Sequence, residues 1–222
     1  MTKEAAITFD HNQTGVRVPA RALTQAGFRE WIVSAECPDE ARASWIDGEV
    51  LIDMSPEAID THNNVKTALI VTLGALVRDE ERGELFADGV LFTNQEAGVS
   101  TEPDVTFVSF TAVEQGRVHF TAKAGRPDDR LELQGTPDLV AEVLSDSSER
   151  KDDELLRGAY ARAGVPEYWV IDARSDTLRF EILVLDGGSY QKATESRVFG
   201  RAFTLTRTKN RLQRWTYRLS SP

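Results

Sequence analysis

The stretch Asp138-Leu139-Val140-Ala141-Glu142-Val143-Leu144-Ser145 is short and strongly apolar, with one carboxylate near its end. Its composition is typical of a buried β-strand. A second stretch, Glu102-Pro103-Asp104-Val105-Thr106-Phe107-Val108, has the same character and contains Asp104. A carboxylate within such a run costs several kcal/mol unless it is paired or binds a cation. We therefore expect Asp104 and Glu142 to lie on adjacent strands and to converge on one divalent metal ion.

Two carboxylates form an all-oxygen site, which suits Mg²⁺ or Mn²⁺. Such an ion lowers the pKa of a bound water and stabilises negative charge on a phosphoryl oxygen. The nearest cation in the sequence is Lys151, nine residues after Glu142 at the start of a predicted helix. An ammonium there would position the water or neutralise the transition state. The alternative is that internal arginines pair with Asp104 and Glu142.

Two further side chains are candidates for the same site. His62 precedes Val65 by three residues and Leu69 by seven, so helical spacing places it on the inward-facing stripe. Its imidazole would point towards the sheet with Asp104 or Glu142 as partner, although an inward histidine is often only a core residue. Glu49 follows a predicted Asp47-Gly48 turn and is a possible third carboxylate. The alternative for Glu49 is an exposed strand position.

The remaining pattern predicts a mixture of helices and strands. Helices are expected over 23–34, 57–81 and 149–163, a hairpin over 44–52, and strands near 85–93, 104–110, 117–121, 138–145, 167–172, 177–186, 189–193, 201–207 and 212–219. Asp60 or Ser55 would cap the second helix, Gly83 would end it, and Gly164 would end the third. This order predicts an α+β (mixed α/β) fold, in which helices flank a central mixed sheet with an antiparallel C-terminal extension.

Length and composition fit one domain of 222 residues with an ordinary core. The single cysteine fits a reducing compartment, so we expect a cytoplasmic protein. No apolar run is long enough for a membrane span. The net charge is −10, yet residues 197–222 contain seven basic side chains and no acidic one. This basic stretch could contact phosphates, or it could be a solvated strand face.

Several motifs together resemble the bacterial Uma-two family of restriction endonucleases. They are Trp45-Ile46-Asp47-Gly48-Glu49-Val50, Met54-Ser55-Pro56, His62, Pro103-Asp104-Val105, the Glu142 strand, and Tyr160-Ala161-Arg162-Ala163-Gly164-Val165-Pro166-Glu167-Tyr168-Trp169-Val170-Ile171-Asp172. The resemblance runs from about residue 19 to residue 206. It implies the restriction-endonuclease-like fold of the PD-(D/E)XK nuclease superfamily. We expect a single domain, 1–222, in which the weakly patterned residues 1–18 form an extended arm. The resemblance also implies Mg²⁺-dependent hydrolysis of phosphodiester bonds.

By this resemblance, Asp104 matches the metal-binding aspartate and Glu142 the acidic residue of the E-x-K motif. The lysine of that motif would fall at Leu144, and many relatives instead have a lysine at the position of Leu156. The chain lacks both, so Lys151 is the expected substitute.

The resulting hypothesis is an endonuclease that cleaves DNA, in which Asp104 and Glu142 bind Mg²⁺ or Mn²⁺ and Lys151, His62 and Glu49 complete the site. Cleavage of both strands would favour a homodimer. Leu144 and Leu156 favour an alternative, a catalytically impaired nuclease fold that binds nucleic acid or a protein partner. A third possibility is a nuclease for RNA or a small phosphodiester, because 2′-OH recognition leaves no short motif.

Overall fold

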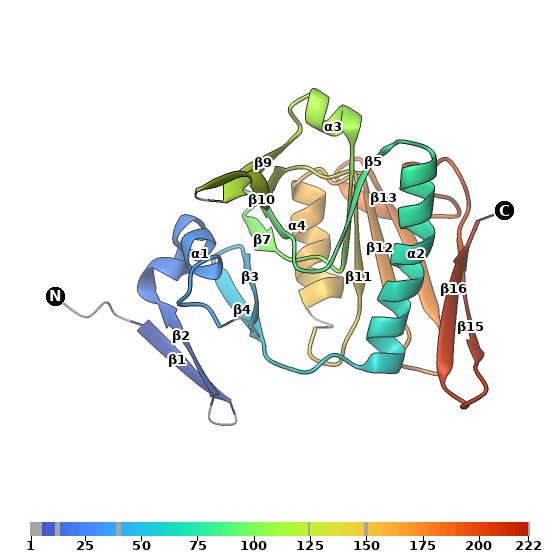
Figure 1. Ribbon diagram of the computed structural model, residues 1–222, viewed down its shortest axis with the longest axis horizontal. Helices are drawn as coiled ribbons and strands as arrows, with labels where there is room; N and C mark the ends of the chain where they lie inside the picture. Colours follow the sequence, from blue (N-terminus) through green and yellow to red (C-terminus); the bar gives the residue numbers. More distant parts are fainter. Residues whose placement is uncertain (1–5, 12–13, 39–40, 124, 149–150, 222) are drawn as a thin grey trace.

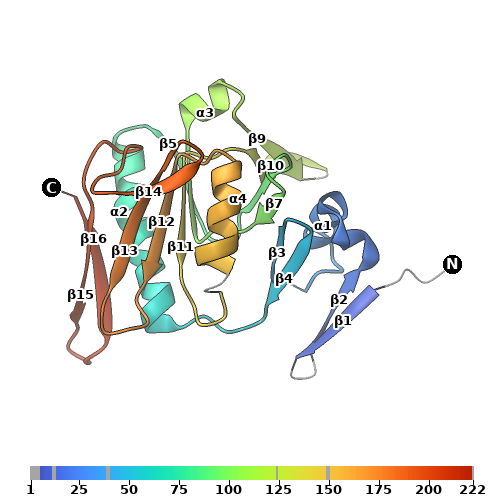
Figure 2. The same cartoon turned by 180° about the vertical axis from the view of Figure 1, so that it is seen from behind.

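A six-stranded mixed sheet forms the centre of the computed structural model, which describes residues 6–11, 14–38, 41–123, 125–148 and 151–221 (Figures 1 and 2). In spatial order its strands are β14 (Ser189–Ala193), β13 (Arg179–Asp186), β12 (Glu167–Asp172), β11 (Leu139–Val143), β8 (Val105–Ser109) and β5 (Gly83–Ala87). Strands β11 and β12 are parallel, and the other neighbours are antiparallel. Every residue of β11 is buried, as its continuous apolar pattern predicts for a strand covered on both faces.

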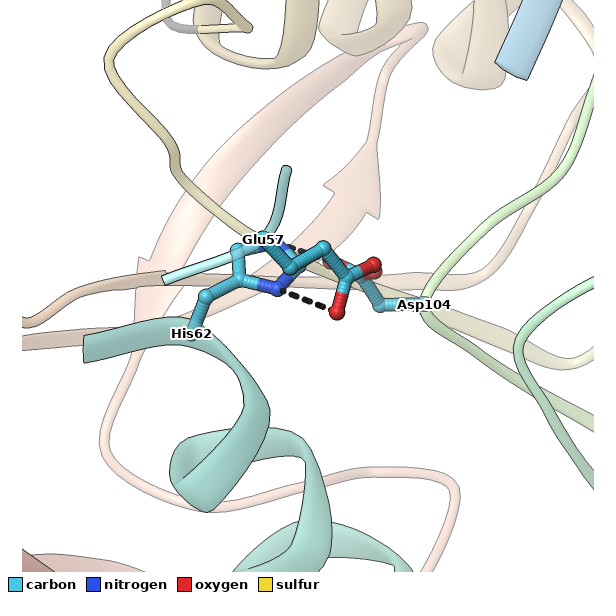
Figure 3. A group of neighbouring side chains, drawn as sticks. All are labelled: Glu57, His62 and Asp104. Atoms are coloured by element: carbon cyan, nitrogen blue, oxygen red, sulfur yellow. Dashed lines mark ion pairs between the residues drawn. The ribbon is translucent and has the colours of Figure 1, made fainter. Parts of the chain in front are cut away.

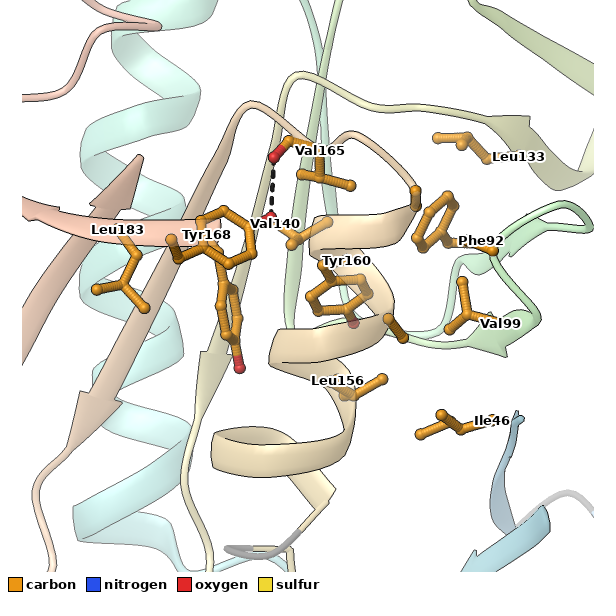
Figure 4. Packing of buried hydrophobic residues seen from close by; sticks show 14 of the residues in the cluster. Ile46, Phe92, Val99, Leu133, Val140, Leu156, Tyr160, Val165, Tyr168 and Leu183 are labelled. Carbon is orange, nitrogen blue, oxygen red and sulfur yellow. Dashed lines mark hydrogen bonds between the residues drawn. The ribbon is translucent and has the colours of Figure 1, made fainter. Parts of the chain in front are cut away.

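A helix covers each face of this sheet. On one face lies α2 (Asn64–Asp79), which continues from the π-helical turn η2 (Ile59–Asn63). On the other lies α4 (Arg157–Arg162), which continues from the π-helical turn η3 (Lys151–Leu156). Side chains of β11 alternate between two clusters: Ala141 packs with Leu69 of α2, whereas Val140 packs with Leu156 and Tyr160 of the other helix (Figure 4). Glu142 is two residues after Val140 and therefore faces α4.

A second six-stranded sheet lies beside the first. Its strands are, in spatial order, β4 (Glu49–Asp53), β3 (Arg42–Ile46), β7 (Val99–Thr101), β6 (Leu91–Asn94), β10 (Arg126–Gly135) and β9 (Val118–Lys123). The other elements are β1 (Ala6–His11), β2 (Thr14–Pro19), the 3₁₀ turn η1 (Ala20–Leu23), α1 (Gln25–Ile32) and α3 (Phe110–Glu114). A separate antiparallel hairpin, β15 (Thr204–Lys209) and β16 (Trp215–Ser220), runs along α2 (Figure 1).

The predicted α+β class and most predicted elements are confirmed. The Asp47-Gly48 turn has φ values of 50° and 89°, the left-handed conformation that a two-residue hairpin turn requires. Gly164 follows the last turn of α4 with a φ of 72°, as a C-terminal glycine should. In the described part of the predicted N-terminal arm, β1 and β2 pair as a hairpin. Residues 149 and 150, which begin the third predicted helix, lie outside the described residues.

Three expectations about local structure are wrong. Gly83 does not end α2 but begins β5, where a Cβ atom would lie 2.0 Å from the carbonyl oxygen of Val108. The helical segment begins after Ala58 without a side-chain cap, so neither Asp60 nor Ser55 caps it. The predicted strand at 85–93 is two strands, β5 and β6, which belong to different sheets.

Strand β10 was not predicted, because its first half is highly charged and its apolar positions are few. None of the described helices combines the length and the apolar character that a membrane span needs.

Candidate metal centre

Asp104 and Glu142 are brought together by the register of β8 and β11. Val105 lies opposite Ala141 in this antiparallel pair. Asp104, which precedes Val105, therefore lies opposite Glu142, which follows Ala141. Two hydrogen bonds link them across the strands. The Val143 N–H donates to Asp104 Oδ2 at 2.7 Å, and the Asp104 N–H donates to Glu142 Oε2 at 3.4 Å. Each acidic side chain thus accepts a hydrogen bond from the backbone of the opposite segment.

His62 lies on the inward-facing side of the helical segment formed by η2 and α2, and its imidazole lies beside Asp104. His62 is buried; its Nε2 lies 3.6 Å from Asp104 Oδ2, and its Nδ1 lies 3.4 Å from Glu57 Oε2 (Figure 3). Nδ1 has no hydrogen-bond partner among the described residues. Glu57, His62 and Asp104 each offer one ligand atom, and these atoms lie within 4.8 Å of one another. Two carboxylates and an imidazole with an unsatisfied nitrogen form a donor set that fits a divalent cation.

Glu142 is held from the opposite side by α4. The Tyr160 hydroxyl donates to Glu142 Oε1 at 2.7 Å, and Tyr160 is itself fully buried in the cluster of Figure 4. Lys151, at the start of η3, places its Nζ 3.1 Å from Asp152 Oδ1. No arginine pairs with Asp104 or Glu142 in the part of the chain that the structure describes. This excludes, for those residues, the structural alternative of internal arginine pairing.

A second lysine, Lys66, lies on α2 one turn after His62. It is buried, and its Nζ is 2.7 Å from Glu57 Oε1, 2.7 Å from Asp88 Oδ2 and 3.6 Å from Asp104 Oδ1. Lys66 therefore ties three acidic segments to the same helix. It supplies positive charge on the α2 side of Asp104, as Lys151 does on the α4 side.

A cavity of about 290 Å³ lies at the junction of the two sheets, and its lining includes Glu57, His62, Asp104, Glu142 and Lys151. Of the described residues that line it, seven are carboxylates, and two, Arg42 and Lys151, are permanently charged cations. The carboxylates are Asp53, Glu57, Asp88, Glu102, Asp104, Glu142 and Asp152. The excess of negative charge attracts a small cation and disfavours an anion unless a cation is bound.

The electrostatics follow from burial in this acidic setting. Burial raises the pKa of Asp104, although the charges of His62 and Lys66 offset part of the effect. Burial, and after it the charge of Asp152, raises the pKa of Glu142 well above its usual value. Burial alone would lower the pKa of Lys151, but Asp152 and Glu142 outweigh it and raise that pKa. Lys151 is therefore an ammonium at neutral pH and not a proton acceptor.

Four of the five predicted site residues line this cavity: His62, Asp104, Glu142 and Lys151. The fifth, Glu49, does not. It is exposed at the start of β4, whereas Leu51, Ile52 and Asp53 farther along that strand line the cavity. The strand position after the turn puts Glu49 on the solvent side, so the alternative interpretation of Glu49 was the better one.

Sequence reasoning missed Glu57, Lys66 and the contact between Tyr160 and Glu142. Glu57 is the first residue of the helix predicted over 57–81, but the structure places it in an irregular segment before η2, so helical periodicity does not give its direction. Lys66 had a signal, since a lysine four residues after His62 falls within the apolar stripe of α2. Tyr160 lies within the helix predicted over 149–163, but the strand carboxylate that it meets follows only from the three-dimensional packing.

A family model described as "Putative restriction endonuclease", named Uma2, matches residues 28–207. The chain belongs to the Uma2 family. Among solved structures, the Uma2 chain is similar to "a putative nuclease belonging to DUF820 from Anabaena variabilis ATCC 29413". The identity is 14%, the TM-score is 0.55, and the match covers 78% of this chain and 86% of the other. At that identity the similarity establishes the fold. No curated protein matches the sequence.

Proposed function

We propose that this Uma2 protein is a metal-dependent endonuclease that hydrolyses phosphodiester bonds of DNA. The observation that carries the proposal is the pair Asp104 and Glu142, buried at the end of two adjacent strands in a cavity with excess negative charge and without an arginine partner among the described residues. Such a pair is costly in a protein that uses it only for stability. Membership in a family described as restriction endonucleases supports the same conclusion.

The donor set fits Mg²⁺ or Mn²⁺ at Asp104, with Glu142, Glu57 and His62 close to it. A divalent cation bound there would supply a water of lowered pKa and neutralise charge on the phosphate. The imidazole nitrogen of His62 makes Mn²⁺ the better match, because Mg²⁺ prefers oxygen ligands. Tyr160 would fix the orientation of Glu142, and the Val143 N–H that of Asp104.

Lys151 would take the part of the absent motif lysine. Leu144 and Leu156, the two positions where a lysine is missing, are both buried in the apolar cluster on the α4 side. Lys151 begins η3, five residues before Leu156, and lines the cavity beside Glu142. Its ammonium would stabilise the negative charge that develops on the phosphate during hydrolysis.

The test is cleavage of supercoiled plasmid by the purified protein with Mg²⁺ or Mn²⁺. We expect nicking by the wild type in the presence of metal and a loss of more than about 100-fold in Asp104→Asn, because removing one such electrostatic element typically has that effect. Glu49→Gln is the matched control, since it removes an acidic side chain that the structure places outside the cavity. Equal nicking by wild type and Asp104→Asn would refute the assignment.

The burial of Leu144 and Leu156 also supports the second candidate, a nuclease fold without catalysis that binds nucleic acid or a protein. Its signature is a wild-type protein that binds Mn²⁺ but nicks neither plasmid DNA nor RNA. Cleavage of both strands of DNA would require two copies of the site, which we propose are supplied by a homodimer. Linear product that appears only at protein concentrations where a dimer forms would support that arrangement.

A further inference from the structure

The hairpin of β15 and β16 concentrates positive charge without negative charge. Its segment, residues 204–220, contains Arg207, Lys209, Arg211, Arg214 and Arg218 and no acidic residue. Arg211, Arg214 and Arg218 are exposed and form no ion pair with any residue that the structure describes. By contrast, the exposed Arg78 and Arg126 are paired with Asp79 and Asp129. The hairpin charges are therefore available to an external anion.

The hairpin is held in place along α2 and by further hydrogen bonds near its turn. The guanidinium of Arg207 donates to the carbonyl oxygens of Ala173, Ser175 and Asp176, at 3.3, 3.0 and 2.5 Å. At its turn the Asn210 side chain accepts hydrogen bonds from the N–H groups of Leu212 and Arg214, at 2.8 and 3.2 Å. Arg211 and Arg214 thus belong to an ordered turn whose backbone does not depend on their side chains.

This charged turn lies at the same end of the molecule as the cavity. Asn64, two residues after His62, donates from Nδ2 to the carbonyl oxygen of Trp215 at 3.2 Å. Figures 1 and 2 both show the turn of the hairpin at the end where α2 begins and where β11 leads into η3. A long polymer bound to the turn would therefore extend towards His62 and Asp104.

The acidity of the cavity explains why such a surface is needed. A phosphodiester that approaches the carboxylates meets like charge, and a bound divalent cation cancels only part of it. Binding free energy for a polyanion must come from basic groups outside the cavity. Of the described surface, the hairpin offers unpaired cations next to the site.

We propose that Arg211, Arg214 and Arg218 of the hairpin bind the phosphate backbone of a double-stranded nucleic acid and hold it over the cavity. This inference rests on the proposed nuclease function and identifies the surface that binds the substrate. Trp215, at the start of β16 next to the turn, has Arg207 and Lys209 over its ring, with distances of 4.4 and 5.0 Å to the centroid. A ring covered in this way is a poor platform for the stacking of an unpaired base. The hairpin is therefore better suited to bind the backbone phosphates of a duplex than the bases of a single strand.

The test compares two double variants with equal charge, Arg211→Gln/Arg214→Gln and the control Arg78→Gln/Arg126→Gln. Binding of a fluorescent DNA duplex is measured in EDTA between about 50 and 200 mM salt. The same measurements are made with an RNA duplex and with single-stranded DNA. We expect the hairpin variant to bind duplex about tenfold more weakly, with a salt slope smaller by about two, and the control to bind as the wild type does. The duplex that binds more tightly, DNA or RNA, identifies the source of the phosphates.

The proposal would be overturned by unchanged affinity in the hairpin variant, by equal weakening in both variants, or by preferential binding of single strands. A wild type that binds neither duplex would also overturn it. Asp104→Asn separates this inference from the proposed function. If that variant binds duplex like the wild type and the wild type does not cleave, the hairpin surface stands and the nuclease assignment falls. Circular dichroism of each variant verifies that it is folded.

Discussion

The carboxylates at the two ends of β11 are held in different ways. Asp138, just before the strand, accepts hydrogen bonds from Arg117 and from the N–H of Ser109, the latter at 2.6 Å. Glu142, near its other end, is held by the Tyr160 hydroxyl and faces acidic neighbours. Asp138 forms an ion pair with Arg117, whereas Glu142 forms no ion pair with any described residue and has a raised pKa. The ion pair of Asp138 stabilises the fold, whereas the buried Glu142 lowers the stability of the metal-free protein and leaves a carboxylate that can bind a ligand.

The largest effect we expect is on catalysis, at the cation beside Glu142. Lys151→Met should lower the rate of plasmid cleavage by about 100-fold, because the ammonium that stabilises the phosphate charge is lost. Mn²⁺ affinity should be unchanged or higher, since a positive charge beside the site is removed. Initial rates measured at saturating Mn²⁺ test this, with Lys192→Met as control because Lys192 is exposed and pairs with Glu181 outside the cavity. Full activity in Lys151→Met would show that another group, with Lys66 as the first candidate, does this work.

At the other end of the strand the expected effect is on stability. Asp138→Asn keeps an oxygen for the Ser109 N–H but loses the charge that faces Arg117, so the free energy of unfolding should fall by about 2 kcal/mol. The loss should be the same with and without Mn²⁺. Urea denaturation measures it, with the exposed Asp186→Asn as control. A loss that depends on Mn²⁺ would mean that the two ends of β11 do not differ as described.

In the absence of metal, Glu142→Gln should stabilise the protein, whereas Asp138→Asn should destabilise it. Removing a buried carboxylate with a raised pKa should increase the free energy of unfolding by about 1 kcal/mol at neutral pH, as at many functional sites. The same variant should lose the thermal stabilisation that the wild type gains from Mn²⁺. If Glu142→Gln is less stable than the wild type without metal, Glu142 is a structural residue like Asp138.

The smallest effect is a dependence on pH, and its sign follows from the direction of the pKa shift. Because the folded protein binds the Glu142 proton more tightly than the unfolded chain, this group favours folding fully below the ordinary carboxyl pKa. That contribution is lost as the pH rises through the raised pKa. Metal-free wild type should therefore lose more stability between about pH 5 and pH 8 than Glu142→Gln does. Parallel pH profiles of the two proteins would contradict the assignment of the shift to Glu142.

A site residue could be predicted from the sequence where the residues next to it in the chain form a recognisable pattern. Asp104 and Glu142 each stand in an apolar run, and His62 keeps helical spacing with Val65 and Leu69, so these positions were predictable from neighbouring residues. Glu57 has no such pattern, and its place beside His62 is set by the path of an irregular segment. Lys66 lay within a predictable stripe but its three acidic partners come from separate segments.

The fold shows the same division. Strand β12 was predicted with its observed bounds because an apolar run covered on both faces is unambiguous. The split of 85–93 into β5 and β6 was not, because strand propensity does not specify which sheet a strand joins. The second sheet, which supplies Asp53 and Arg42 to the cavity, was for the same reason absent from the sequence-based description.

The most direct measurement is calorimetric titration of Mn²⁺ into the metal-free protein, with Asp104→Asn and Glu49→Gln measured alongside. If the acidic cluster at the ends of β8 and β11 is a metal centre, wild type and Glu49→Gln will bind Mn²⁺ with the same affinity, and Asp104→Asn will show no binding above the buffer baseline. Absence of binding to the wild type, or equal binding to Asp104→Asn, would contradict it.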